Sequence, residues 1–415
     1  MKTKLSVIAI ALAYGLAAPA FGADATVNQN GNDNTADVSQ LDANYGLLTT
    51  ASVTQNGDSN TATVNQVFVD GPAATISTIG NNNSATIDQH DLIAAQASIA
   101  QDGSLNAAAI TQDTSSDGYA NVGKASITQQ GNSDKATINQ LGTNVAGATT
   151  DGAIAKIDQI GGATNAVALI NQTDLSQRST ANITQSGVAV NGGTASNSAK
   201  IDQTGADQKA SITQNTTQGD TALINQLGMF QQATILQDDS WYAKASIGQT
   251  GIANDANVSQ KHISDVATAT VTQNGTLNSA NVLQTLALYS DATVTQNGSY
   301  NGASVTQDNA RASNATVTQD GNFNLASVNQ TNASAVNATV KQDGILNSGT
   351  INQSGAYNDG TILQNGMMLV ATINQFGLGT GSNHNVALVD QTGSNHVASI
   401  TQTGGAGNQA TVNQH

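Results

Sequence analysis

The chain lacks cysteine altogether, has only two prolines in 415 residues, and draws just 3% of its residues from Phe, Trp and Tyr. Without cysteine there can be no disulfide and no thiolate metal site, so backbone hydrogen bonds and packing must stabilise the fold. The scarcity of aromatic rings argues against a globular core packed with them. We therefore look for a fold that depends on regular backbone pairing.

Positive charge is also scarce. The chain has 12 Lys and Arg residues against 28 acidic residues, all of them Asp, and its net charge is −16. Because phosphate binding requires clustered basic residues, nucleic acid is not expected as a partner. The excess of negative charge is expected to keep separate copies of the chain apart in solution.

What the chain has in abundance is one five-residue pattern, Ala-x-(Val/Ile)-x-Gln, which occurs 32 times between Ala25 and Gln414. The third position is Val or Ile in every copy. Gln fails once, at Thr78, and Gly replaces Ala twice, at Gly349 and Gly360. Copies begin about 11 or 12 residues apart, so two copies and their connections form a repeat of roughly 23 residues, a period typical of stacked folds.

The pattern predicts strands. Side chains alternate along a strand, so Ala, Val/Ile and Gln share one face, and Thr, Ser, Asn, Asp and Lys occupy the other. We therefore predict an all-β, two-sheet β-solenoid of parallel stacked strand-turn-strand repeats, with about sixteen rungs, that runs as one continuous domain over residues 24–415. Val/Ile and Ala fill its interior, and the inward Gln residues form hydrogen-bonded amide ladders.

The N-terminus has the features of a secretory leader. Lys2 and Lys4 are followed by an apolar run from Leu5 to Leu16 and then by small residues. This order predicts a signal peptide over residues 1–23, cleaved between Ala20 and Asp24. The apolar run is too short for a comfortable transmembrane span, so we expect a secreted protein that is not membrane-integral.

Many connections between strands read Gln-x-Gly-x-x-Asn, beginning with Gln29, Gly31 and Asn34. Gly permits the positive backbone dihedral of a tight reversal, and Asn can satisfy backbone groups that the bend leaves unpaired. These arcs follow odd-numbered strands up to Ala181, even-numbered strands after about Ala199, and every strand from Gln342 onward. The change of phase is expected to be a repeat slip that the stack tolerates.

Such an arc and the strand after it read Gln-x-Gly-x-x-Asn-x-Ala-x3-Gln, which resembles the curlin repeat of curli amyloid subunits, and the resemblance covers practically the whole chain after the leader. Two examples are the residues Gln273, Gly275, Asn278, Ala280 and Gln284, and the residues Gln296, Gly298, Asn301, Ala303 and Gln307. The resemblance implies a bacterial, extracellular or cell-surface fibre subunit of a biofilm matrix that folds as a β-solenoid. It implies as partners other copies of the chain, a related curlin-type subunit or nucleator, and outer-membrane secretion machinery. The family's usual Gly- and Asn-rich secretion segment is not found ahead of the first repeat.

The candidate functional residues are therefore structural. The strand edges at the two ends of a solenoid have unpaired backbone groups that can pair with another chain. A head-to-tail contact of this kind does not close, so it generates a filament. We expect such assembly through uncapped terminal strands. Besides the ten residues above, the candidates are Ala25, Val27, Gln29, Gly31, Asn34, Ala36, Val38, Gln40, Ala410, Val412 and Gln414.

No enzymatic activity, cofactor or metal is expected, because the carboxylates and histidines do not cluster. His384 and His396 lie one strand period apart and are the nearest approach to a metal pair. The alternative function is a secreted monomeric solenoid that binds ice or another surface through outward Thr pairs such as Thr293 and Thr295. A calcium-loaded β-roll is disfavoured because its Gly-Gly-x-Gly-x-Asp repeats are absent.

Overall fold

The computed structural model describes residues 23–42, 48–69, 71–92, 94–113, 123–142, 152–173, 178–187, 197–263 and 266–415. The predicted leader, residues 1–23, lies outside the described residues except for its last position, and so does most of the predicted cleavage region. Within the described residues there are 32 strands, one for each copy of the repeat, and no helix. No described segment is therefore a helix long and apolar enough to cross a membrane.

The chain divides into two compact units, residues 1–216 and 217–415. In the first unit the odd-numbered strands are β1 (Asp24–Asn30), β3 (Thr50–Asn56), β5 (Ala73–Ile79), β7 (Gln96–Ser104), β9 (Lys124–Asn132), β11 (Ile154–Thr164), β13 (Thr180–Ser186) and β15 (Lys209–Asn215). The even-numbered strands are β2 (Thr35–Asp42), β4 (Thr61–Val69), β6 (Ser84–His90), β8 (Ala107–Asp113), β10 (Lys135–Leu141), β12 (Val167–Thr173) and β14 (Ser198–Thr204).

The second unit repeats this plan. Its odd-numbered strands are β17 (Gln232–Asp238), β19 (Asp255–Lys261), β21 (Ser279–Thr285), β23 (Gly302–Asp308), β25 (Leu325–Ser334), β27 (Ser348–Ala356), β29 (Val370–Leu378) and β31 (Val397–Thr403). Its even-numbered strands are β16 (Thr221–Met229), β18 (Lys244–Ile252), β20 (Thr268–Thr276), β22 (Asp291–Ser299), β24 (Asn314–Asn322), β26 (Asn337–Ile345), β28 (Asn358–Met367), β30 (Asn385–Ser394) and β32 (Gln409–Gln414).

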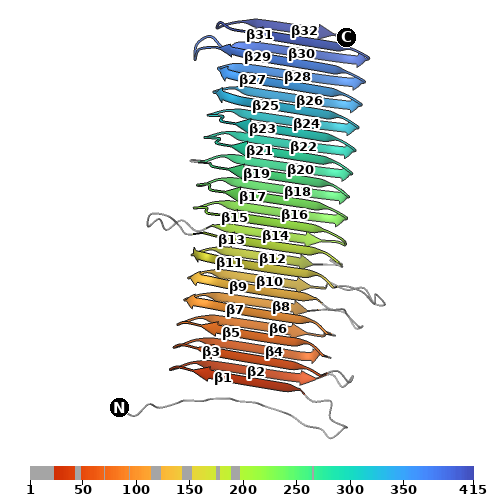
Figure 1. Cartoon of the computed structure of the whole chain (residues 1–415). Coiled ribbons are helices and arrows are strands. Elements are labelled where there is room, and N and C mark those ends of the chain that lie inside the picture. Colours follow the sequence, from red (N-terminus) through yellow and green to blue (C-terminus); the bar gives the residue numbers. More distant parts are fainter. Residues whose placement is uncertain are drawn as a thin grey trace. The chain divides into compact units, whose positions relative to one another are not determined.

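Within each unit, successive odd strands pair in parallel to form one sheet and successive even strands form a second, so the chain crosses to the other sheet after every strand (Figure 1). The repeat sets the register. Between β20 and β22, Ala269 lies opposite Ala292, Val271 opposite Val294, and Gln273 opposite Gln296. The predicted all-β, two-sheet β-solenoid is confirmed. The prediction of one continuous domain over residues 24–415 stays a prediction.

The core of each unit lies between its two sheets. Most strands show strict alternation, as in β23, where Ala303, Val305 and Gln307 are buried and the residues between them are partly exposed. The central Val or Ile of nearly every strand is 0–1% exposed. Burying one such side chain stabilises a fold by about 1.5–3 kcal/mol, which favours this facing of the strand over the reverse.

Candidate functional site: amide ladders and terminal rungs

The inward Gln residues form continuous hydrogen-bonded ladders. In the even sheet of the second unit, each Nε2 donates to the Oε1 of the Gln one rung further along, at 2.7–3.0 Å. The members are Gln226, Gln249, Gln273, Gln296, Gln319, Gln342, Gln364, Gln391 and Gln414. All these bonds run in one direction, so each ladder has a donor end and an acceptor end.

The same amides also join the two sheets. Gln273 Nε2 donates to the backbone oxygen of Asp255 at 3.0 Å, and Gln296 Nε2 donates to that of Ser279 at 3.0 Å. A buried amide with no partner would be costly, but each member here uses both its oxygen and its nitrogen. The ladder residues therefore fix both the register along the stack and the contact between sheets.

The ladder of the odd sheet in the first unit has one break. Gln55 would be followed by Gln101 with one member between them, but that position holds Thr78. The Thr78 side chain is fully buried, and neither its Oγ1 nor the Oε1 of Gln101 has a hydrogen-bond partner. This break lies in the one copy of the repeat whose fifth residue is not Gln in the sequence.

A second kind of ladder is formed by the Asn residues of the arcs. Asn301 Oδ1 accepts the backbone N–H of Asn324 at 3.0 Å, and Asn301 Nδ2 donates to the oxygen of Gly321 at 2.8 Å. The column comprises Asn254, Asn278, Asn301, Asn324 and Asn347 in the second unit. In the first unit the corresponding column, Asn34, Asn60, Asn83 and Asn106, precedes even strands instead. The phase change predicted from the sequence is visible in this exchange of edges.

The glycines of these arcs form a column as well. Gly275 and Gly298 have φ values of +125° and +114°. A Cβ added at Gly275 would lie 1.9 Å from the oxygen of Gly298, so side chains are excluded by the close stacking of rungs as well as by backbone conformation. Gly31 has the same relation to Gly57.

Two buried aspartates were not recognised as special from the sequence. Asp134 takes the place of the arc Asn in its column, and its Oδ1 accepts the N–H of Ala166 at 2.9 Å. Asp220 accepts from the Ser240 hydroxyl and from the N–H of Ala243. Burial raises the pKa of Asp134 to about 6 and that of Asp220 to about 7. The arc sequence QQGNSD, which ends in Asp134 where other arcs end in Asn, was the available signal.

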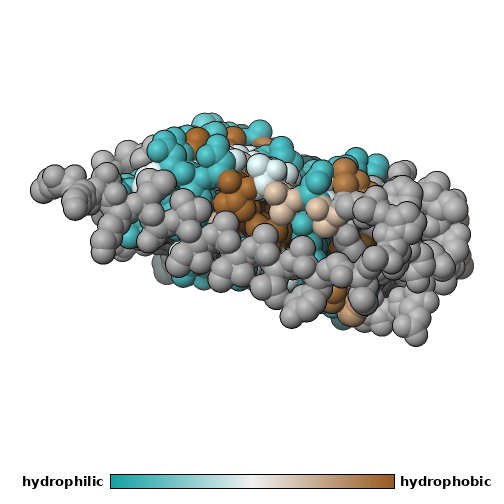
Figure 2. All heavy atoms as spheres, turned by 90° about the horizontal axis from the view of Figure 1, so that it is seen from below, coloured by the Kyte–Doolittle hydropathy of each residue, from teal (hydrophilic) through white to brown (hydrophobic). Residues whose placement is uncertain are grey.

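The terminal rungs differ from all others in burial. In β1, Ala25 is exposed and Val27 and Gln29 are half-buried. In β32, Ala410, Val412 and Gln414 are likewise only half-buried. The face seen from below in Figure 2 shows apolar residues among hydrophilic ones. Inward side chains that every other rung covers are thus open to solvent here.

The other predicted residues lie where the repeat places them. In β2, Ala36 is buried, whereas Val38 and Gln40 are half-buried. Ala280, Gln284, Ala303 and Gln307 are buried members of β21 and β23. The structure therefore aligns candidate residues of the same kind in columns that run from rung to rung along a sheet. It places the candidates of the first and last strands at rungs whose inward side chains are partly exposed.

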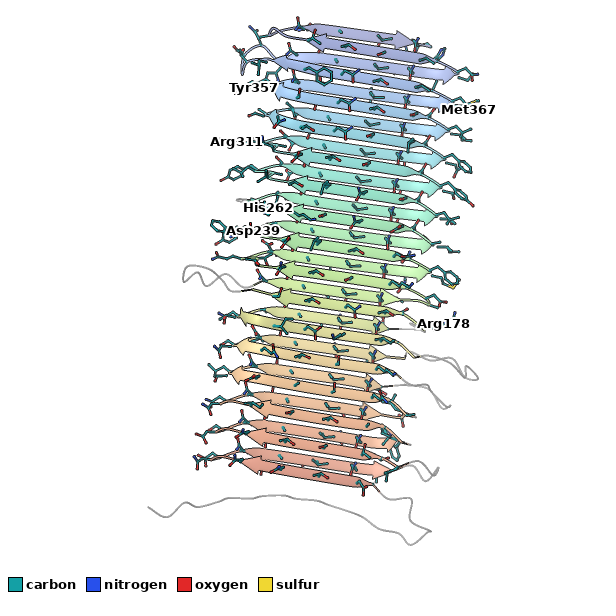
Figure 3. The ribbon with its side chains drawn as sticks, viewed as in Figure 1. Arg178, Asp239, His262, Arg311, Tyr357 and Met367 are labelled. Carbon is teal, nitrogen blue, oxygen red and sulfur yellow. The ribbon has the colours of Figure 1, made fainter. Side chains whose placement is uncertain are left out.

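Three of the five histidines lie beside aspartates, and one of them is His90, whose Nε2 lies 2.7 Å from Asp88 Oδ1. His262 Nδ1 lies 3.0 Å from Asp239 Oδ2, at an edge of the second unit (Figure 3), and His384 Nδ1 lies 2.7 Å from Asp359 Oδ2. Among the described residues, no group of three or more metal-ligating side chains occurs.

The outward Thr residues form two columns on the even sheet of the second unit. One column holds Thr270, Thr293, Thr316, Thr339 and Thr361 in register. The other holds Thr272, Thr295 and Thr318, and then Lys341 interrupts it. A complete Thr pair is therefore present on three successive rungs.

Comparison with known proteins identifies the repeat. The family model described as "Curlin associated repeat" matches residues 289–321 and 381–404. A search of curated proteins finds no significant match. The first range covers β22, β23 and most of β24, and the second covers β30 and β31. The chain thus carries curlin associated repeats in these two ranges, which confirms the resemblance inferred from its sequence.

Proposed function

We propose that the chain is a structural subunit of an extracellular, curli-like fibre that assembles head to tail through its terminal rungs and serves biofilm matrix formation and surface adhesion. The curlin repeats and the β-solenoid fold fit a curli-like structural protein. The proposal assigns the chain no catalytic role. Its partners are other copies of itself, a related curlin-type subunit or nucleator, and outer-membrane secretion machinery.

The observation that carries the proposal is the direction of the Gln ladders. At the first rung, Gln29 and Gln40 donate to the next rung at 2.6 and 2.8 Å, and no preceding rung among the described residues supplies a donor to their Oε1 atoms. At the last described rung, the Nε2 of Gln414 donates to the oxygen of Val397 at 3.2 Å, and no later rung among the described residues supplies a ladder acceptor. One end therefore presents amide acceptors and the other presents amide donors.

The two ends are also matched in side chains. Strand β1 has the inward sequence Ala, Val, Gln, as does β32, and β2 shares it. In the assembled fibre, β1 of an incoming copy continues the sheet after β31, and β2 continues it after β32. The amide of Gln402 then donates to Gln29 of the next copy, and that of Gln414 donates to Gln40.

The free backbone edge of β32 can be located from its pairing. The N–H of Val386 donates to the oxygen of Asn408 at 2.8 Å, so the outward residues of β30 direct their N–H groups toward β32. Because alternate residues of a strand bond to opposite neighbours, the outward Thr411 and Asn413 direct theirs away from β30. Proline at these two positions removes the N–H groups that a further copy would accept while leaving the β30–β32 bonds intact.

The experiment is seeded growth of the mature chain, measured with an amyloid dye and by electron microscopy. The variant Thr411→Pro/Asn413→Pro is compared with Thr411→Ala/Asn413→Ala, which keeps both N–H groups. The proline variant is expected to elongate parental seeds more slowly by roughly tenfold or more, since two hydrogen bonds of about 1 kcal/mol each are lost. If both variants extend seeds equally fast and both are folded by circular dichroism, growth does not use this edge and the proposal fails.

The Thr columns favour the second candidate, binding of ice or another ordered surface by the even sheet of the second unit. Three successive rungs with complete Thr pairs supply the start of a regular hydroxyl array. An ice-recrystallisation assay comparing the parent with Thr293→Lys/Thr295→Lys tests it, and equal inhibition by the two proteins would exclude this role.

A further inference from the structure

Seven successive even-numbered strands of the second unit place apolar side chains along one edge, either at the last residue of the strand or in the arc that follows it. These strands are β16, β18, β20, β22, β24, β26 and β28, and Met367 marks this edge in Figure 3. We call the set the apolar ridge. Each member is 41–51% exposed, and the members are Met229, Phe230, Ile252, Leu277, Tyr300, Phe323, Ile345, Leu346, Met367 and Met368.

The ridge is continuous because its arcs stack in register. The N–H of Tyr300 donates to the oxygen of Thr276 at 2.9 Å, and that of Phe323 donates to the oxygen of Ser299 at 3.0 Å. The rings of Tyr300 and Phe323 stack with centroids 4.8 Å apart and an interplanar angle of 7°. Seven rungs span about 29 Å at the usual strand spacing of about 4.8 Å.

Backbone conformation makes these side chains unexpected. Leu277, Tyr300 and Phe323 have φ values of +56°, +59° and +58°, in the left-handed region that bulky residues disfavour and that Asn and Asp tolerate. In the first unit the equivalent arc position follows odd-numbered strands, and among its described residues only Leu105 is apolar. Its other members are Asp33, Ser59, Asn82, Ser133 and Asn165.

The second unit thus accepts a conformational penalty at these positions without burying the side chains in its own fold.

The exposed part of the ridge is large enough for a specific interface. Half-exposed side chains with total areas of about 150–250 Å² each add up to about 900 Å² over ten residues. A stable protein–protein interface buries about 800 Å² on each partner. A second copy of the chain offers an identical ridge with the same spacing between rungs, so the two surfaces match in length and periodicity.

Charge selects the orientation of the two copies. Asp320 and Asp343 lie beside the fifth and sixth rungs of the ridge and are paired with each other in register. In a parallel arrangement each would face its own counterpart, and like charges repel. In an antiparallel arrangement the two copies are related by a two-fold axis at the fourth rung, which is the rung of Tyr300. Asp320 of one copy then faces the rung of Asn274 in the other, and Asp343 faces the rung of Thr250, so the like charges are kept apart.

We propose that the apolar ridge is an interface between two copies of the chain, which pair antiparallel with Tyr300 of each at the two-fold axis. Such an interface is isologous and closes as a dimer. It is separate from the terminal rungs, so it joins monomers or neighbouring fibres side by side and does not depend on head-to-tail growth.

The absence of cysteine from the chain makes a direct test possible. In full-length protein, Tyr300→Cys introduces a single thiol at the proposed axis, and Leu105→Cys introduces one at the matching arc position of the first unit. Mild oxidation is expected to link Tyr300→Cys into a covalent dimer, because residues at a two-fold axis approach within the roughly 7 Å that a disulfide between Cα positions allows. Dimer yields no higher than those of Leu105→Cys would overturn the proposal.

A second measurement does not rely on cross-linking. Sedimentation velocity is run on Thr411→Pro/Asn413→Pro, so that end-to-end contacts do not contribute, with and without Leu277→Asn/Tyr300→Asn/Phe323→Asn. Asn suits the left-handed conformation, so the ridge variant is expected to fold and to sediment as a monomer, while the protein with the intact ridge sediments as a concentration-dependent dimer. The proposal is contradicted if both proteins sediment as monomers, which would leave the ridge to a different partner. It is also contradicted if both sediment as dimers. Neither outcome bears on seeded elongation of the parent, which tests the fibre proposal separately.

Discussion

Replacing Asp134 with Asn should stabilise the first unit and change how its stability depends on pH. In this column, Asn106 Nδ2 donates to the oxygen of Gly131 at 2.9 Å. The next rung has Asp134 in place of Asn, and Ala163 is paired with Gly131. The carboxylate oxygen of Asp134 that corresponds to Nδ2, its Oδ2, has no hydrogen-bond partner. An ionised Asp134 therefore presents an oxygen where the column requires a donor.

The sign of the effect follows from the pKa. Burial raises the pKa of Asp134 from 3.8 to about 6, so between these values the folded chain binds more protons than the unfolded chain. The contribution of Asp134 to stability is therefore greatest below about pH 4, falls as pH rises to about 6, and stays at that lower level above it. The full difference corresponds to about 3 kcal/mol, and screening by solvent near the arc reduces it to about 1–2 kcal/mol. A restored hydrogen bond adds about 1 kcal/mol at neutral pH.

The assay is urea unfolding followed by circular dichroism at pH 4.5 and pH 7.5. Asp134→Asn is expected to raise the free energy of unfolding by about 2 kcal/mol at pH 7.5 and by clearly less at pH 4.5. The control is Asp102→Asn, which makes the same chemical change at an exposed position of a neighbouring arc and should alter stability little at either pH. A gain of equal size at both pH values, or a loss at pH 7.5, would refute the assignment of Asp134 as a misplaced carboxylate in the Asn column.

Three further substitutions test the ladders and the facing of the strands. Thr78→Gln should fill the break next to Gln101 and raise the free energy of unfolding by about 1 kcal/mol in urea titrations; a decrease would show that the position cannot hold the ladder. Ile247→Asp places a charge at a fully buried position and should lower the free energy of unfolding by several kcal/mol. The outward Ser246→Asp should change it little, and equal losses would mean that the inward and outward faces of the strand are wrongly assigned. Gly298→Ala introduces a Cβ 2.0 Å from a backbone oxygen of the next rung, so hydrogen exchange in the flanking strands should accelerate, and unchanged exchange would exclude this close stacking.

Much of the fold follows from the sequence because inward and outward residues alternate within every copy of the five-residue pattern. Val271 and Gln273 must share a face whatever the connections do, and a column of identical residues then sets the register. The inward Gln ladder was predictable for the same reason. The Thr78 break was visible in the sequence, although its two unpartnered atoms become apparent only when Gln101 is placed on the next rung.

Features that depend on which arcs stack on each other were not predictable. The apolar ridge joins residues about 23 positions apart, such as Tyr300 and Phe323, through arcs that the sequence indicates only as tight reversals. Each rung contributes only one or two exposed apolar residues, and scattered residues of this kind are common. The buried state of Asp134 was missed because the depth of the Asn column depends on how closely the Gly column stacks.

The direction of the backbone hydrogen bonds has a mechanical consequence. Strand β20 pairs with β22 at nine positions, and the backbone hydrogen bonds between them lie along the stacking direction. A pull along the stacking direction therefore loads every bond of a rung at once, and a rung yields only when all of them fail together. A pull on a loose end of the chain instead loads the bonds of one strand one after another and peels it away. Material built from these rungs should resist stretching along the stack far better than unravelling from an exposed strand, so fibre wear should begin at ends and not in the middle.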